Sequence, residues 1–286
     1  MRKSIAIIIT SILVLSGCNK QQSVSDRLLN EVEKAIAINP DSASNLLKSI
    51  SSPEKLDDKA FARWCMLSGK ITDEIFNSIL PTYQLERAYD WYSSHGSPDE
   101  QVQILIYLGR SYFADGDYDK AMSIYTNALD IAGKNKLNNL IGYTYDYIGD
   151  LYREKFMRTE AIKRYEIAAE YFKKEKNTDS YACALRDIGR EYAQMDSLSH
   201  ALNILIIANS VAANTSNINV TASINNALGN IYSMQNKYDK AEEYLLKALL
   251  TGREKMPDYV ALIDLYTASN SCLLYTSDAA DDLIGV

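Results

Sequence analysis

The chain has 286 residues, of which 47% are hydrophobic, so it can bury a sizeable core and is too apolar for wholesale disorder. Its 12 glycines and 5 prolines are too few for a β protein of many strands and turns. The formal net charge of −7, without any lysine-rich run, argues against nucleic acid as a partner.

The start of the chain differs from the rest. A basic N-terminus precedes an apolar run at residues 5–15, which is too short to cross a bilayer comfortably and is typical of a secretory leader. The run ends in the sequence LSGC, which resembles the lipobox of bacterial lipoproteins. This resemblance implies a signal peptide at 1–17, lipidation of Cys18, a polar tether at 18–25, and attachment to the inner or outer membrane of the cell envelope with a periplasmic domain. An ordinary secretory leader with an incidental cysteine is the alternative.

Next comes a helical region with degenerate repeats. The pattern predicts a short helix pair at 26–38 and 41–50, broken by an Asn-Pro sequence. Gly69 lies in a strongly apolar helix, but the position that should hold its small partner is Pro81. The sequence SPDE at 97–100 is a helix-start signature and opens a more regular array.

From residue 99 the sequence repeats four times with a period of 40 residues. Each repeat has a glycine, a tyrosine three residues later, an alanine twelve residues after the glycine and a second alanine seven residues further on. The glycines are Gly109, Gly149, Gly189 and Gly229. The tyrosines are Tyr112, Tyr152, Tyr192 and Tyr232. The first alanines are Ala121, Ala161, Ala201 and Ala241.

A recurring glycine inside a helix needs a steric reason, because glycine costs about 1 kcal/mol relative to alanine there. We expect that two antiparallel helices approach closely at each glycine. The two alanines of each repeat lie two turns apart on one face of the second helix and would provide the matching small surface.

These columns resemble the tetratricopeptide repeat, whose pattern is W-x2-L-G-x2-Y, then A-x3-F, then P. The first copy matches at Leu105, Leu108, Gly109, Tyr112, Gly116, Tyr118, Ala121, Tyr125 and Ala128. The resemblance implies an all-α fold, a right-handed α-solenoid of antiparallel helix hairpins. The tryptophan and the late proline are missing, and the period is 40 rather than 34. Because the glycine-to-alanine spacing is unchanged, we expect the six extra residues at the end of the second helix or in the link to the next repeat. With its leader, the chain resembles tetratricopeptide lipoproteins of the Bacteroidetes envelope.

The end of the chain departs from the pattern. A fifth repeat begins on schedule, but from Cys272 the columns fail, and the sequence CLLYTSDAAD resembles the translation of an adapter used in sequencing libraries. This resemblance implies that the natural protein continues beyond Ser271; a genuine irregular tail is the alternative. The predicted organisation is a leader at 1–17, a tether at 18–25, a degenerate helical region at 26–98, four repeats at 99–256, the start of a fifth at 257–271 and a non-native tail at 272–286.

Catalytic and metal-binding patterns are missing from the sequence. His95 and His200 lie at or next to expected turns, without cysteine or histidine neighbours at ligand spacing. The sequence contains no phosphate-binding glycine loop, no nucleophile elbow and no H-E-x-x-H helix. We therefore expect a protein that is not an enzyme and that uses no cofactor or metal.

The family resemblance implies that the first helix of each repeat lines a concave groove, where positions four residues apart face inward. The partner-binding residues expected there are Ile106 and Arg110, Asp146 and Asp150, Arg186 and Arg190, and Asn226 and Asn230, with Arg153 extending the second row. One interpretation is a charged groove that holds an extended peptide, with arginine on carboxylates and asparagine on the peptide backbone. The other is that the aspartates pair with the arginines of the neighbouring repeat, at about 0–1 kcal/mol each.

Two functions follow from these expectations. The first is a membrane-tethered scaffold that binds a partner protein or peptide in the bacterial cell envelope. The second is the sensory half of a truncated envelope signalling or transcription-regulating protein. A hydrophobic stretch of about 20 residues in the natural reading frame after Ser271 would favour the sensor. An enzyme with an unrecognised site is a third alternative, with no group of residues behind it.

Overall fold

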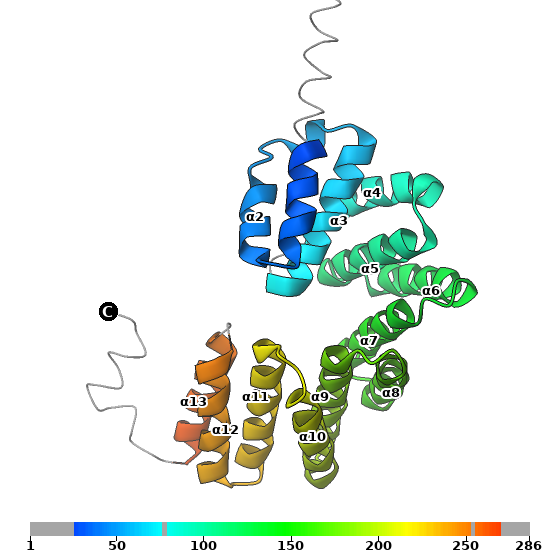
Figure 1. Cartoon of the computed structure of the whole chain (residues 1–286). Coiled ribbons are helices and arrows are strands. Elements are labelled where there is room, and N and C mark those ends of the chain that lie inside the picture. The colour runs from blue at the N-terminus through cyan, green and yellow to red at the C-terminus, as the bar shows by residue number, and fades with distance from the viewer. Residues whose placement is uncertain (1–25, 76–78, 253–254, 270–286) are drawn as a thin grey trace, which may run out of the picture. The chain divides into compact units, whose positions relative to one another are not determined.

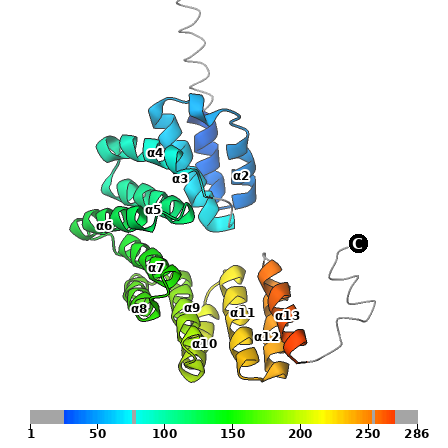
Figure 2. The ribbon, with the colours of Figure 1, turned by 180° about the vertical axis from the view of Figure 1, so that it is seen from behind.

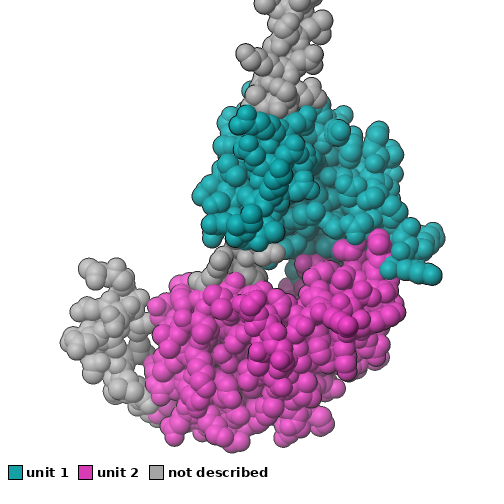
Figure 3. Space-filling view, in the orientation of Figure 1, with its two compact units in different colours: residues 1–136 teal, residues 137–286 magenta. Residues whose placement is uncertain are grey.

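The computed structural model describes residues 26–75, 79–252 and 255–269, so the predicted leader, Cys18, the tether and the tail lie outside the described residues. Within these ranges every regular element is a helix, and within each unit successive helices pack against each other as hairpins (Figure 1). The predicted all-α class, an α-solenoid of helix hairpins, is confirmed. The chain divides into two compact units, 1–136 and 137–286 (Figure 3), and the division falls between the first and second regular repeats.

Unit 1 contains the degenerate region and the first regular repeat. Residues 26–36 are helical, and the predicted break after them is a helix start, because the Asn39 side chain accepts a hydrogen bond from the Ser42 amide at 3.0 Å. The following elements are α2 (Pro40–Lys48), the 3₁₀ turn η1 (Pro53–Lys55), α3 (Asp58–Ile75), α4 (Thr82–His95), α5 (Pro98–Ala114) and α6 (Tyr118–Lys134). Ser97 and Glu100 form the predicted helix start of α5 as a reciprocal capping box.

Unit 2 contains three further regular repeats and the first helix of a fifth (Figure 2). Its elements are α7 (Asn138–Glu154), α8 (Arg158–Lys174), α9 (Thr178–Gln194), α10 (Leu198–Ala212), α11 (Ile218–Met234), α12 (Tyr238–Thr251) and α13 (Met256–Ala268). Among the first helices, α9 contacts α11 and α11 contacts α13, whereas the second helices α8, α10 and α12 make no comparable contacts with one another. The first helices α9, α11 and α13 therefore form one layer. We call the side of the first helices of unit 2, α7 included, that lies away from the second helices the inner face of unit 2.

The repeated glycines lie at equivalent places on successive first helices, α5, α7, α9 and α11, as predicted. A Cβ atom added to Gly149 would lie 2.5 Å from Cε1 of Tyr165, and one added to Gly229 would lie 2.6 Å from Cγ of Leu245. The side chains that meet the four glycines are Tyr125, Tyr165, Leu205 and Leu245. We call these four contacts the glycine seam.

The seam corrects one detail of the prediction. The nearest side chain to each glycine is not an alanine but the tyrosine or leucine four residues after the first alanine. Both alanine columns are fully buried, so they leave room on either side of the tyrosine or leucine and let that side chain reach the glycine. A close backbone approach is thus present, but a large side chain fills it.

The six extra residues per repeat lie in the helices. In the second regular repeat α7 and α8 each have 17 residues, and the links 155–157 and 175–177 are short. The second helix runs well past the second alanine of the repeat pattern, Ala168, to Lys174, which agrees with the first of the two predicted locations. The links turn sharply because Phe156 and Lys176 adopt left-handed backbone conformations, with φ of 56° and 58°.

The degenerate repeat packs differently from the regular ones. Gly69 lies on α3, but a side chain there would meet the ring of Tyr107 on α5 rather than a residue of its own partner helix α4. Pro81 immediately precedes the first residue of α4, where the missing amide of proline is tolerated.

An ion pair also joins consecutive hairpins of unit 2. Arg158, the first residue of α8, lies 3.0 Å from Glu191 of α9, whose side chain is only 2% exposed. A carboxylate buried this deeply requires a charged partner, so this pair helps to fix how the two hairpins dock.

We expect Gly149→Leu to destabilise unit 2, because the new side chain would overlap the Tyr165 ring. Overpacking of this kind costs about 1–3 kcal/mol, and we expect the upper end of this range, measured as a lower urea midpoint in circular dichroism. Gly133→Leu is the control, because Gly133 is exposed on α6 and an added Cβ there meets nothing. Equal midpoints for the wild type and Gly149→Leu would contradict the glycine seam.

Candidate functional site

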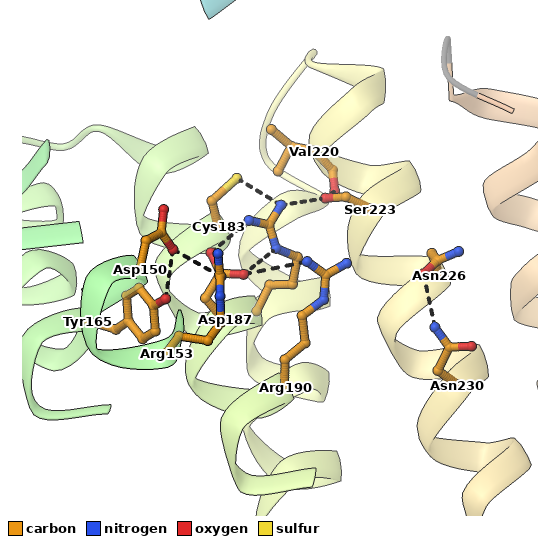
Figure 4. Close-up of polar contacts among 11 residues, drawn as sticks. Asp150, Arg153, Tyr165, Cys183, Asp187, Arg190, Val220, Ser223, Asn226 and Asn230 are labelled. Atoms are coloured by element: carbon orange, nitrogen blue, oxygen red, sulfur yellow. Dashed lines mark hydrogen bonds and ion pairs between the residues drawn. The ribbon is translucent and has the colours of Figure 1, made fainter. Parts of the chain in front are cut away.

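The predicted partner-binding residues divide between the two units. Arg110 and Ile106 lie on α5 of unit 1, where Arg110 forms an ion pair with Asp73 of α3 and Ile106 is buried. The other seven lie in unit 2 on three successive first helices. They are Asp146, Asp150 and Arg153 on α7, Arg186 and Arg190 on α9, and Asn226 and Asn230 on α11. Figure 4 labels Asp150, Arg153, Arg190, Asn226 and Asn230.

The α7 row is held partly by its own hairpin. Arg153 Nη1 lies 2.9 Å from Asp150 Oδ1, and the Tyr165 hydroxyl of α8 donates a hydrogen bond to the same carboxylate at 2.8 Å. Desolvation raises the pKa of Asp150, and the charge of Arg153 opposes that rise. Arg153 and Tyr165 therefore hold the Asp150 carboxyl group in place, and Arg153 supplies the opposite charge.

The α9 row is organised around a residue that the sequence did not single out. Arg186 binds Asp187 through two hydrogen bonds, from Nε at 3.0 Å and from Nη2 at 2.7 Å, and its Nη1 reaches Ser223 Oγ of α11 at 3.0 Å. Asp187 is 5% exposed, and although desolvation opposes its ionisation, Arg186 keeps its pKa below the usual value. The guanidinium group of Arg186 is therefore already bound to Asp187, the next residue in the sequence.

Arg190 and Asp146 are the least satisfied charges of the cluster. Arg190 Nη1 lies 3.5 Å from Asp187 Oδ1, its side chain is 42% exposed, and it donates no hydrogen bond within the described chain. Asp146 Oδ1 is buried without any hydrogen-bond partner. Desolvation raises the pKa of Asp146 well above its usual range, and the nearby Asp150 and Asp187 raise it further.

The predicted alternative, in which the aspartates pair with the arginines of the next repeat, is wrong. Neither Asp146 nor Asp150 forms an ion pair with Arg186 or Arg190. The ion pairs run within single helices instead, because an arginine three residues after Asp150, or directly before Asp187, reaches a carboxylate on its own helix.

The α11 row has two asparagines with different surroundings. The buried Asn226 donates a hydrogen bond to Asp258 of α13 at 2.7 Å, and so links the last two first helices. Asn230 is exposed and donates to Asn226 Oδ1 at 3.0 Å, and its side-chain oxygen accepts no hydrogen bond from the described residues. Asn230 can therefore bond an incoming group, whereas Asn226 positions it.

Sequence reasoning missed the buried acid Asp187 because the inward stripe was taken as positions four apart on each helix. The signal was nevertheless present. Its column in the repeat otherwise holds Tyr107, Tyr147 and Ala227, so a charged residue there indicates a buried ion pair.

Other potentially reactive groups are engaged elsewhere. Desolvation raises the pKa of the Cys65 thiol to about 12, and that of Cys183 above its usual value. His95 stacks on Trp91 at a ring-centroid distance of 5.0 Å, and His200 stacks on Tyr192 at 5.7 Å. In the described ranges no three His, Cys, Asp or Glu side chains group as a metal site, and no helix is long and apolar enough to span a membrane.

Residues 105–138 and 221–256 match family models described as tetratricopeptide repeat. The chain contains tetratricopeptide repeats. It is 32% identical over 91 residues to the photosystem I assembly protein Ycf3 of Rippkaea orientalis, a match that covers 31% of this chain and 52% of that protein. The chain thus spans about half the length of the curated relative that it matches.

Solved structures share the fold of this tetratricopeptide chain. A Rap protein complexed with Competence and Sporulation Factor is similar with a TM-score of 0.73 at 18% identity, over 93% of this chain and 76% of that one. The apo form of the quorum sensor NprR from B. thuringiensis has a TM-score of 0.56 at 14% identity, over 88% and 73% of the two chains. At such identities the similarity shows the fold alone.

We expect Asp146→Asn to stabilise the protein at neutral pH. A carboxyl group whose pKa is higher in the folded state than in the unfolded state stabilises the fold when protonated, and that contribution is lost as the pH rises through the folded pKa. Each unit of elevation corresponds to about 1.4 kcal/mol. Urea unfolding at pH 4.5 and pH 7 should therefore show a larger gain for the variant at pH 7.

The matched control is Asp187→Asn, which removes a carboxylate whose pKa Arg186 holds below its usual value, and which should therefore lower stability at pH 7. If Asp146→Asn is instead destabilising at both pH values, the carboxylate has a partner that supports the fold.

Proposed function

We propose that this chain is a binding protein rather than an enzyme, and that it holds an extended segment of a partner protein on the inner face of unit 2. The observation that carries the proposal is the set of polar groups there whose hydrogen-bonding capacity the fold leaves unused: Arg190, Asn230 and Asp146. An arginine can bind a carboxylate through two parallel hydrogen bonds, and an amide can bond the backbone of an extended peptide.

The arrangement of these groups supports an elongated ligand over a small molecule. They come from three successive first helices and therefore form a row along the solenoid rather than the wall of a closed pocket. Stacked repeats present such extended surfaces because each hairpin contributes the same few positions. No cofactor is needed for this role.

A sensory role is the second candidate. One structure with the same fold is described as a quorum sensor, and another is complexed with Competence and Sporulation Factor. In that case the same inner face would bind the signal, and the chain would be the sensory half of a longer envelope signalling or transcription-regulating protein. The two candidates share the binding step and differ in what the bound state controls.

The proposal includes a lipid anchor at Cys18, in a protein of the Bacteroidetes envelope type whose repeats lie in the periplasm. It is supported by the leader and the LSGC sequence alone. Two acyl chains on one cysteine would give stable attachment, whereas a single chain gives only marginal, reversible binding.

The binding surface is tested by replacing its two accessible polar groups, Arg190 and Asn230, together with alanine. A phage library of random dodecapeptides, panned on the wild-type chain, should yield binders whose affinity falls by at least about tenfold in this variant. Two hydrogen-bonding groups worth about 1 kcal/mol each would account for this loss. Arg186 is left intact, because removing it would leave the buried Asp187 unpaired.

The matched control replaces one basic residue and one asparagine on second helices, Lys174→Ala with Asn203→Ala, both exposed. Its affinity should equal that of the wild type. If the library yields no binders, or if the variant and the control lose affinity equally, the inner face of unit 2 is not the binding surface.

The anchor is tested separately in cells. Radiolabelled palmitate should be incorporated into the wild-type chain and not into Cys18→Ser, and the variant should move from the membrane fraction to the soluble fraction after lysis. A wild-type chain that stays unlabelled would show the leader to be an ordinary secretory one.

A further inference from the structure

The inner face of unit 2 carries a cluster of three carboxylates and three guanidinium groups on α7 and α9 (Figure 4 shows most of its members). Two ion pairs are closed within the fold, Asp150 with Arg153 and Asp187 with Arg186. The remaining two charges, Asp146 and Arg190, do not pair with each other. The cluster has equal numbers of acidic and basic side chains. Arg190 forms only a looser ion pair, at 3.5 Å from Asp187, and its side chain stays 42% exposed, whereas Asp146 forms no ion pair within the described residues.

No neighbouring group supplies a donor to Asp146. On its own helix Arg153 binds Asp150, on α8 the Tyr165 hydroxyl also binds Asp150, and on α9 Arg186 binds Asp187 and Ser223. One oxygen of the Asp146 carboxylate is nevertheless buried without a hydrogen bond. Burying an unpaired charged group opposes folding, so nothing in the folded chain itself explains the presence of aspartate here.

A comparison within unit 2 shows what a satisfied acid looks like. Asp258 is 4% exposed and accepts a hydrogen bond from Asn226, and Glu191 is 2% exposed and pairs with Arg158. Asp146 differs from both because it has a buried oxygen and no donor. Among the described residues no group donates to this oxygen, and a ligand with a hydrogen-bond donor could complete the bonding of this carboxyl group.

We propose that Asp146 binds a cationic group of the bound segment, an ammonium or guanidinium, while Arg190 binds a carboxylate of the same segment. The inference rests on the proposed function and adds the chemistry of its ligand. Asp146 and Arg190 come from successive first helices, so an extended segment that contacts both groups should carry its two charges on different residues.

The test pans the dodecapeptide library separately on the wild-type chain and on Asp146→Asn. We expect the wild type to enrich peptides that carry both a lysine or arginine and an acidic residue. The variant should keep the acidic preference, because Arg190 is unchanged, and should lose the basic one. A free α-amino group is the other source of a cation, and peptides that bind only when their N-terminus is not acetylated would identify it.

A double-mutant cycle on one selected peptide measures the contact directly. Replacing its basic residue by norleucine should weaken binding at least about tenfold to the wild type and hardly at all to Asp146→Asn. Asp150→Asn is the control, because that carboxylate already has an arginine and should show a smaller coupling. Urea unfolding of each variant verifies that it is folded.

The outcomes separate this inference from the proposed function. Enriched peptides without a basic preference, or equal preferences for the wild type and Asp146→Asn, would overturn the inference and leave peptide binding standing. If the wild type enriches no peptide at all, both are overturned.

Discussion

The close contact between a glycine on one helix and a tyrosine or leucine on the next is the constraint on which the repeat array depends. At Gly149 there is no space for even a methyl group against Tyr165, so the two helices of the hairpin can be held in only one register. The same contact recurs at Gly109, Gly189 and Gly229. Because each hairpin is fixed in this way, residues 40 apart within one unit occupy equivalent places on successive hairpins. Their side chains therefore line up in a row.

This regularity was readable in the sequence because it depends on small residues and spacing. Glycine inside a helix is disfavoured, so its recurrence indicates a close contact without further information. The helix start at Ser97 was readable for a similar reason, since a capping box is a local pattern of hydrogen bonds. The spacing did not show that a large side chain fills the contact. That position holds tyrosine in some repeats and leucine in others, and only the structure shows that Tyr165 and Leu205 fill the same place beside the glycine.

The charge pairing was less predictable, and the reason is the length of the arginine side chain. The position of Arg186 on a helix fixes where its Cα lies, but the guanidinium reaches an acid one residue away as readily as one on the next repeat. The structure has it on Asp187, where a short bidentate contact in a buried place exceeds any exposed alternative. A helical-wheel argument places residues on faces of a helix, but it cannot decide which acid a long arginine side chain will bind.

It follows that the charged residues on the inner face of a repeat array indicate a ligand only where they are not already paired with each other. Counted as a row, α7 and α9 present alternating acidic and basic residues, which suggests a surface that grips anything charged. Arg186 and Asp187 pair with each other inside the fold, and Asp150 pairs with Arg153, so these four side chains are already engaged. Two groups are left as candidates for recognition: Asp146, which has a buried oxygen without a hydrogen bond, and Arg190, whose side chain stays 42% exposed beside its 3.5 Å ion pair with Asp187. A ligand would then be selected by how well its own charges fit Asp146 and Arg190. The residues that pair within the fold contribute by holding these two side chains in place.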